Sequence, residues 1–387
     1  MIPGTILMDV TRLAARKLEN RHPTGVDRVG LAYLRRYRTR SRALVRHGRR
    51  WLHLSGGASE RLFSALLGES DRPLRDLKLA VASGHLASFR NCRDCLFLNL
   101  GHSGTELPQY ARNLDRRGVR PVYFVHDLIP LTHPEYVREG EDRQHALRLA
   151  TMAATARGLL YNSAATQEAV TRYLAGNGLR VPPGVAAPLG GENLPPPAAV
   201  APLSEPYFLV LGTIEPRKNH LLLLHLWRRW AAEEGTGPVP RLVLAGRRGW
   251  ECEQVVDLLD RSPSLKDRVL EIPACSDGEL STWLAHARAL LFPSFAEGFG
   301  LPLVEALAFG VPVLASDLPV FRESAGPVPE YLDPLDGPGW QAALRDYAAG
   351  GPRREAQTGR IRSFRPWRWE DHFRLVESFF AGIADHA

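Results

Sequence analysis

Short apolar runs alternate along this chain with longer stretches in which apolar residues recur at helical spacing. The apolar runs of the first half predict strands at residues 5–10, 42–54, 95–101, 120–128 and 157–163. Those of the second half predict strands at 207–213, 241–246, 268–274, 287–294 and 311–316. The periodic stretches predict helices that include 26–37, 219–234, 277–286 and 302–309. The run at 42–54 turns at Gly48 and therefore predicts a hairpin, whereas strands separated by helices favour parallel sheets covered on both faces.

The segment 182–206 divides the chain. It contains eight prolines, so we expect neither a helix nor a strand to continue through it. Because the same alternation appears on both sides, the sequence predicts an α/β protein of two doubly wound parallel-sheet domains that face each other across a cleft. We place the first domain at 1–195, the second at 204–364 and a terminal helix at 365–387. Ligands of such sheets bind beyond the carboxyl ends of the strands.

The glycine-rich turn at 297–301 carries the most specific candidate chemistry. A predicted strand ends near Ser294, and Pro302 suits the first position of a helix, where its missing N–H costs nothing. Gly298 and Gly300 allow the backbone to approach a ligand closely. The amides that open the helix favour an anion such as phosphate.

Two glutamates, Glu297 and Glu305, flank this turn. A carboxylate can accept hydrogen bonds from two hydroxyls at once, which suits the vicinal diols of sugars. The pattern therefore predicts that each glutamate binds a different carbohydrate ring. The alternative is that Glu297 is a helix-start acid favoured by the dipole and that Glu305 is a surface residue.

Two adjacent cations, Arg217 and Lys218, follow the predicted strand at 207–213. At the carboxyl end of a strand they can clamp a diphosphate, arginine as a planar fork and lysine as a point charge. The chain has only four lysines beside 45 arginines, so a lysine at this position is suggestive. The alternative, a basic helix start, is disfavoured by the helix dipole.

Several segments together resemble glycosyltransferase family 4. In the second half they are GTIEPRKN at 212–219, AGRRGW at 245–250 and EGFGLPLVE at 297–305, which contains the family's Glu-x7-Glu signature in full. In the first half, 126–136 and 161–170 resemble segments of its bacterial mannosyltransferase-like branch, and 23–37 corresponds to the glycine loop and first helix. The resemblance covers nearly the whole chain, and it is strong in 207–325 and looser in 38–120. It implies the GT-B fold, in which two Rossmann-like domains face each other.

The resemblance also implies roles for individual residues. Arg217 and Lys218 would hold the donor diphosphate, Glu297 the hydroxyls of the transferred sugar and Glu305 the ribose diol. The implied donor-binding residues are Gly25, Arg217, Lys218, Ile272, Ala274, Glu297, Gly298, Phe299, Gly300, Leu301 and Glu305. The implied catalytic residues are His126, Glu297, Arg217 and Lys218. His126 would lie beside the donor sugar, and the alternative is an ordinary histidine at a strand end.

The family's chemistry implies a retaining transfer of a hexose from a nucleotide sugar to a glycan or lipid-linked oligosaccharide, in bacterial surface polysaccharide synthesis. Mannose from GDP-mannose is the first candidate, and UDP- or dTDP-sugars stay open as donors. No metal site and no cofactor beyond the donor are expected, because the cation pair neutralises the charge that develops on the departing diphosphate. A sugar-nucleotide epimerase of the same fold is a second enzyme class. The terminal helix is expected to cross back onto the first domain through Trp367, Trp369, Phe373, Phe379 and Phe380, and a membrane-inserting helix is the alternative.

Charge and composition limit the kinds of partner that the protein is expected to bind. The 387 residues carry a net charge of +7, and nine arginines lie between residues 28 and 50. Such a field favours a phosphorylated ligand, an anionic membrane or nucleic acid, but no nucleic-acid-binding motif accompanies it. Contact with an anionic membrane and an acceptor cleft that grips acidic groups therefore remain as alternatives. The sequence does not decide the oligomeric state.

The chain lacks two further sequence signals. No apolar run is long enough to span a bilayer and no signal peptide begins the chain, so we expect a cytoplasmic protein with peripheral contact at the inner face of the membrane. Cys92 and Cys95 form one C-x-x-C without the second pair that zinc sites need.

Overall fold

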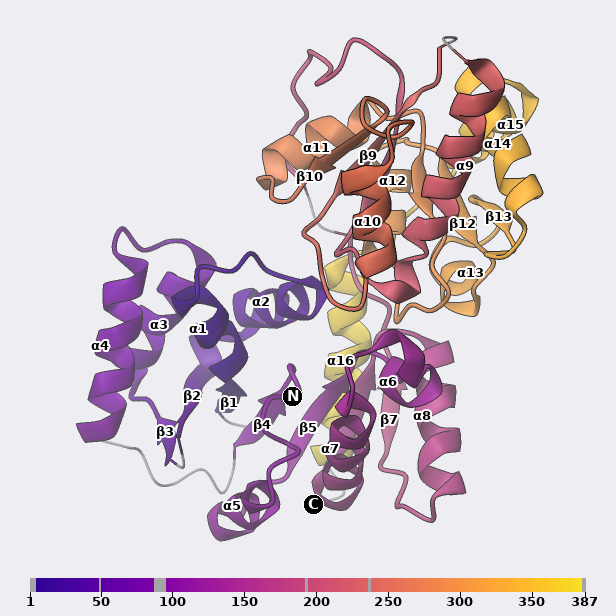
Figure 1. Ribbon diagram of the computed structural model, residues 1–387. Coiled ribbons are helices and arrows are strands. Elements are labelled where there is room, and N and C mark those ends of the chain that lie inside the picture. Colours follow the sequence, from indigo (N-terminus) through magenta and orange to yellow (C-terminus); the bar gives the residue numbers. More distant parts are fainter. Residues whose placement is uncertain (1–4, 49, 87–94, 192–193, 236–237, 385–387) are drawn as a thin grey trace. The chain divides into compact units, whose positions relative to one another are not determined.

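The computed structural model describes residues 5–48, 50–86, 95–191, 194–235 and 238–384 (Figure 1). The chain forms two compact units. The first comprises residues 1–128, 143–189 and 369–387, and the second comprises residues 129–142 and 190–368. The sequence predicts an uninterrupted first domain up to residue 195, whereas the structure assigns 129–142 to the second unit.

A mostly parallel sheet organises the first unit. In the described residues its seven strands follow the order β3-β2-β1-β4-β5-β6-β7. They are β1 (Ile6–Asp9), β2 (Ser41–His47), β3 (Arg50–His53), β4 (Leu96–Asn99), β5 (Pro121–Val125), β6 (Gly158–Tyr161) and β7 (Gly184–Ala186). Only the pair β2–β3 is antiparallel among these, and Gly48 between them has a φ of 59°, which confirms the predicted hairpin.

Helices connect these strands as the alternation of the sequence predicts. They are α1 (Thr11–Leu18), α2 (Gly25–Tyr37), α3 (Gly56–Leu67), α4 (Pro73–Leu86), α5 (Gln109–Arg117), α7 (Glu141–Thr155) and α8 (Ala164–Gly176), with the short η1 (Arg38–Arg40). The core between helices and sheet is aromatic as well as aliphatic, and Tyr33, Phe97 and Phe124 are fully buried in it.

The strand β7 corrects the expectation that no strand passes through the proline-rich segment 182–206. It pairs in parallel with β6, with Leu159 opposite Gly184, and the amide of Leu159 donates to the carbonyl of Pro183 at 2.9 Å. Because β7 lies at the edge of the sheet, it needs hydrogen-bond partners on one side only. Prolines can therefore precede it without a lost ladder bond.

The terminal helix α16 (Trp369–Ala384) packs within the first unit. Phe373, Val376 and Phe380 are buried along one face, and the Phe379 ring covers Gly158. The Tyr33 hydroxyl lies 2.8 Å from Nε2 of His372 on this helix. Trp367, predicted to belong to this face, instead precedes the helix and is 39% exposed.

A second, wholly parallel sheet organises the second unit. Its six strands in the described residues follow the order β10-β9-β8-β11-β12-β13. They are β8 (Tyr207–Leu211), β9 (Arg241–Ala245), β10 (Val269–Ile272), β11 (Leu290–Phe292), β12 (Val313–Ser316) and β13 (Glu330–Leu332). The helices are α9 (His220–Glu234), α10 (Glu253–Arg261), α11 (Asp277–Ala285), α12 (Leu301–Ala308), α13 (Pro319–Ala325), α14 (Gly337–Ala349) and α15 (Pro352–Ile361). Chain order reverses between β8 and β11, so the loops after these two strands flank a topological switch point, where such sheets bind ligands.

Residues 129–142 belong to this unit because their side chains pack there. The segment contains α6 (Ile129–Thr132) and η2 (Pro134–Tyr136). The Tyr136 ring stacks on Phe295, with centroids 5.4 Å apart and planes at 12°. The Arg138 guanidinium lies 5.1 Å from the centre of a Trp250 ring. In the part of the chain that the structure describes, no helix is both long and apolar enough to cross a bilayer.

Candidate functional site

The switch point of the second unit joins two segments that lie 79 residues apart in the sequence. One is the loop after β8, which forms the short helix η3 (Pro216–Lys218), and the other follows β11. The Phe295 amide donates to the carbonyl of Arg217 at 2.8 Å, and Nη1 of Arg217 donates to the carbonyl of Ala296 at 3.0 Å. The structure therefore brings the predicted cation pair and the predicted glycine-rich turn together.

Two cations and two carboxylates form the centre of this site. The Glu297 carboxylate lies 2.5 Å from Nζ of Lys218 and 2.7 Å from Nη1 of Arg217, and it accepts a hydrogen bond of 2.8 Å from Ser294. On its other side, Arg217 places Nη2 2.6 Å from Glu215. The four charged groups, which we call the switch-point cluster, are Glu215, Arg217, Lys218 and Glu297. The cluster is formally neutral.

Burial and pairing shift the ionisation of this cluster. Burial alone would raise the pKa of Glu297, but Arg217 and Lys218, with hydrogen bonds from Lys218 and Ser294, lower it to about 2. Burial raises the pKa of Glu215 above its ordinary value, although Arg217 opposes this shift. Burial also lowers the pKa of Lys218, against the attraction of Glu297. The contacts thus favour an ionised Glu297 held by two cations.

Glycines allow the loops to pack this closely. Gly212 has a φ of 132°, and the Lys218 side chain approaches to within 3.4 Å of the place of a Cβ there. Lys218 also lies 4.7 Å from the centre of the Phe292 ring. Gly300 has a φ of 97° and caps α12, and a Cβ there would lie 2.6 Å from the Phe321 ring. Alanine would be strained at either position.

The structure also bears on the other predicted donor residues. Glu305 lies on α12 with only 3% of its surface exposed, so the alternative of a surface residue is wrong. Phe299 and Leu301 are also buried. Ile272 ends the edge strand β10, with its carbonyl bound to the Gly246 amide at 2.9 Å, and Ala274 is exposed. These last two residues lie apart from the switch-point cluster, because β9 separates β10 from β8.

The predicted histidine lies at the carboxyl edge of the first sheet. His126 follows β5, is 6% exposed and stacks on Phe124 with ring centres 4.6 Å apart. Its Nε2 is 2.7 Å from the carbonyl of Leu100, which places the proton on that nitrogen. Burial lowers the pKa of His126, although the bond to Leu100 opposes the shift. A neutral imidazole fits both a site residue and an ordinary strand-end histidine.

The predicted Gly25 turn contains groups that the sequence analysis missed. Gly25 is the first residue of α2, and the carboxylate of Asp27 accepts hydrogen bonds of 2.7 Å and 2.6 Å from the amide and hydroxyl of Thr24. Asp27 is 2% exposed and pairs with Arg12 at 2.8 Å and Arg16 at 2.7 Å. The Thr-x-x-Asp spacing before an apolar run is a capping-box signal that could have revealed this carboxylate.

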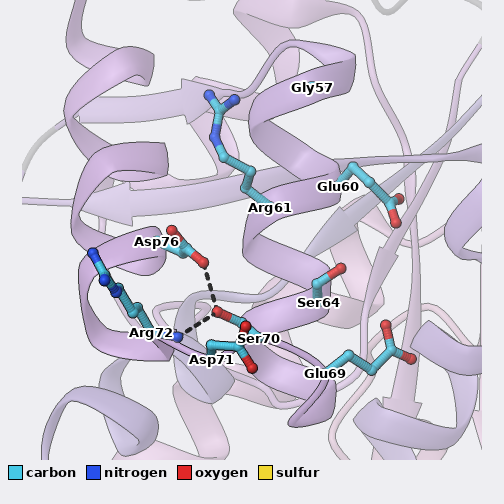
Figure 2. Close-up of a pocket in the computed structure, with 9 residues that line it drawn as sticks. All are labelled: Gly57, Glu60, Arg61, Ser64, Glu69, Ser70, Asp71, Arg72 and Asp76. Carbon is cyan, nitrogen blue, oxygen red and sulfur yellow. Dashed lines mark hydrogen bonds between the residues drawn. The ribbon is translucent and has the colours of Figure 1, made fainter.

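A hollow elsewhere on the first unit is a weaker candidate (Figure 2). It lies over α3, α4 and the loop between them, and it is lined by Gly57, Glu60, Arg61, Ser64, Glu69, Ser70, Asp71, Arg72 and Asp76. The Ser70 hydroxyl donates to Asp76 at 2.5 Å and accepts from the Arg72 amide at 3.1 Å, so these groups complete the start of α4. Arg38 pairs with both Glu60 and Glu69. The polar groups in these contacts serve the local fold.

Metal-ligating side chains do not gather in the described residues. No group of three or more His, Cys, Asp or Glu side chains there is arranged to hold a metal ion. Cys95 and Cys275 are half-buried and Cys252 is buried, while Cys92 lies outside the described residues.

Known proteins resemble this chain in sequence. Residues 196–327 match the family model described as "Glycosyl transferases group 1". The chain is 32% identical over 244 residues to "Serotype-specific mannosyltransferase WbdA" of Escherichia coli, which covers 58% of this chain and 29% of that protein. It is 34% identical over 145 residues to "O-antigen chain mannosyltransferase RfbU" of Salmonella typhimurium, covering 37% and 38%. The chain thus spans between about a quarter and two fifths of the length of these relatives.

Solved structures resemble it over nearly its whole length. The Anabaena Alr3699/HepE structure in complex with UDP and glucose matches with a TM-score of 0.67 and 16% identity, covering 98% of this chain and all of that one. An α,α-trehalose 6-phosphate synthase from Burkholderia multivorans matches with a TM-score of 0.62 and 12% identity, covering 99% of both chains. At such identities the likeness shows the fold alone. The chain therefore has the GT-B fold of two Rossmann-like domains, and its residues 196–327 match the glycosyl transferases group 1 family model, in line with the predicted resemblance to glycosyltransferase family 4.

Proposed function

We propose that this protein is a glycosyltransferase that moves a hexose from a nucleotide sugar onto a glycan or lipid-linked acceptor in bacterial O-antigen synthesis. The observation that carries the proposal is the switch-point cluster, which lies inside the segment that matches the family model. The mannosyltransferase names of the relatives favour mannose, with GDP-mannose as the first candidate donor. Structural neighbours in complex with UDP keep UDP-sugars as the alternative.

The cluster supports a specific division of labour. Arg217 and Lys218 bind the diphosphate and neutralise the charge that grows on it as the sugar departs, the role a divalent cation would otherwise fill. Glu297 binds hydroxyls of the transferred sugar and Glu305 the ribose. In this scheme neither glutamate is a general acid, and the departing phosphate accepts the proton of the acceptor hydroxyl on the same face. The anomeric configuration is then retained.

A binding panel followed by a transfer assay tests the proposal. A ligand that binds only the folded chain stabilises it by about 2.7 kcal/mol at a hundred times its Kd, so thermal unfolding should move upward with the correct donor. We expect one of GDP-mannose, UDP-glucose and dTDP-glucose to give the largest shift and then to be consumed when glycan acceptor is added. NMR of the product should show the anomeric configuration of the donor. A protein whose thermal unfolding none of these nucleotide sugars alters would contradict the proposal.

The structure of the basic segment at 28–50 supports membrane contact less strongly than the count of its arginines does. Arg36 pairs with Glu377 at 2.7 Å, Arg46 with Asp9 at 3.0 Å, and Arg38 with two glutamates. These ion pairs cancel part of the positive field between residues 28 and 50. Peripheral contact with an anionic membrane stays a prediction.

A further inference from the structure

Two carboxylates from different segments of the chain contact the Arg217 guanidinium. Glu215 lies two residues before it, in the extended residue that opens η3, and contacts Nη2 at 2.6 Å. Glu297 comes from the turn after β11 and contacts Nη1 at 2.7 Å. Glu215 is 4% exposed. A buried carboxylate whose ion pair is with a proposed donor-binding arginine needs an explanation, because a buried charge is costly unless it is well paired.

The carboxylates already occupy the donor atoms that a diphosphate would need. Glu297 contacts Nη1 of Arg217 and Nζ of Lys218, and Glu215 contacts Nη2 of Arg217. A diphosphate can therefore bind both cations directly only if one carboxylate gives up its contact with them. Glu297 is the one that can do so, because it sits in a turn with two glycines and is the proposed partner of the sugar hydroxyls.

Glu215 cannot leave in the same way. It is joined to Arg217 through one intervening residue, and its carbonyl accepts the Lys218 amide at 3.0 Å, which fixes the start of η3. The guanidinium carries N–H groups on several edges, so one carboxylate can hold Nη2 while Nη1 faces a phosphate. Retention of one contact keeps the long side chain oriented when the other is exchanged.

We propose that Glu215 is a positioning residue of the donor site, which holds Arg217 in place while the donor diphosphate replaces Glu297 as the partner of Arg217 and Lys218. This inference rests on the proposed glycosyltransferase function. Glu215 does not touch the donor and acts through Arg217. Its loss therefore affects diphosphate recognition selectively and leaves contacts with the base and ribose unchanged.

The test compares nucleotides that differ by one phosphate. In Glu215→Gln, the affinity for GDP, or for UDP where the panel selects uridine donors, should fall about ten- to a hundred-fold, the cost of losing one charged hydrogen-bond partner. The affinity for the corresponding monophosphate should change far less, and kcat/KM for transfer should fall with the diphosphate affinity. Glu205→Gln is the matched control, because Glu205 is an exposed carboxylate of the same unit that also pairs with an arginine, Arg241, at 2.8 Å.

A double variant separates positioning from a structural role. In the Arg217→Met background, Glu215→Gln should cause no further loss of diphosphate affinity, because Glu215 acts through Arg217. Additive losses would overturn the inference, and so would a folded Glu215→Gln variant with the parental ratio of diphosphate to monophosphate affinity. If Glu215→Gln does not fold, the affinities for diphosphate and monophosphate are compared in Glu215→Asp instead. A parental protein that binds no nucleotide sugar and no nucleoside diphosphate would refute the proposed function itself.

Discussion

Removal of the Lys218 charge should lower the stability of the second unit and slow the transfer reaction. In Lys218→Met the Glu297 carboxylate would keep Arg217 as its cationic partner, at 2.7 Å, but lose the ammonium group at 2.5 Å. Breaking a buried pair costs about 3–5 kcal/mol, and the remaining arginine favours the lower end, about 3 kcal/mol. For a unit of this size, 1 kcal/mol corresponds to about 2–4 °C in Tm, so we expect a decrease of about 6–12 °C. Transfer should slow by roughly ten- to a thousand-fold.

The assay is a double-mutant cycle read by calorimetry and by donor turnover. Lys218→Met/Glu297→Gln removes both charges, so it should be more stable than Lys218→Met alone, although it should stay inactive. Lys266→Met is the control, because Lys266 is an exposed lysine of the same unit. If Lys218→Met unfolds at the parental temperature, or if the double variant loses the sum of the two single losses, the buried-pair reasoning is wrong. Parental transfer by Lys218→Met would refute the clamp.

Four further predictions follow from the structure and the sequence. Gly300→Ala should lower Tm and weaken donor binding, because its φ of 97° costs an alanine about 1–2 kcal/mol and its Cβ would meet Phe321; an unchanged Tm by calorimetry would contradict this. The depressed pKa of Glu297, about 2, contributes stability above the unfolded value near 4.3 that is lost as pH falls toward 2; acid titration of Glu297→Gln should therefore be flatter over that window, and an identical curve would argue against it. Transfer should survive excess EDTA, and a complete loss that Mg²⁺ or Mn²⁺ restores would overturn the cation-clamp mechanism. Anionic liposomes should sediment more protein than neutral ones if the basic segment contacts membranes; equal sedimentation would leave only the acceptor alternative.

Much of the fold follows from the sequence because its strands are almost continuous apolar runs. The strands Tyr207–Leu211 and Val313–Ser316, for example, are buried along their whole length, which is typical of parallel strands covered on both faces. The hydrophobic pattern does not predict the order of the strands in each sheet, because that order depends on which face of the sheet each connecting helix covers. The edge strand at Gly184–Ala186 was missed because only three residues pair and prolines surround them.

The site shows the same limit. The family resemblance implies that Arg217, Lys218 and Glu297 bind one donor, the cations through its phosphates and the glutamate through its sugar. It does not predict that they bind one another, because that contact requires strands β8 and β11 to be neighbours. The sequence did not identify Glu215 as a site residue. It lies two residues before Arg217, and an acid close to two cations is common on exposed loops. Its burial is a property of the fold alone.

The energetics of buried ion pairs argue against a purely structural role for the switch-point cluster. Buried ion pairs often contribute less than apolar residues of the same volume, since desolvation offsets much of the attraction. A neutral arrangement of Arg217 and Lys218 with Glu215 and Glu297 lets the protein keep two cations ionised at a buried strand end without a bound anion. In the proposed mechanism an incoming diphosphate exchanges with a carboxylate that is already in place, so most of the desolvation of the two cations precedes donor binding. The same mechanism predicts selectivity for a diphosphate, because an anion with less charge cannot replace the contacts that Glu297 gives up.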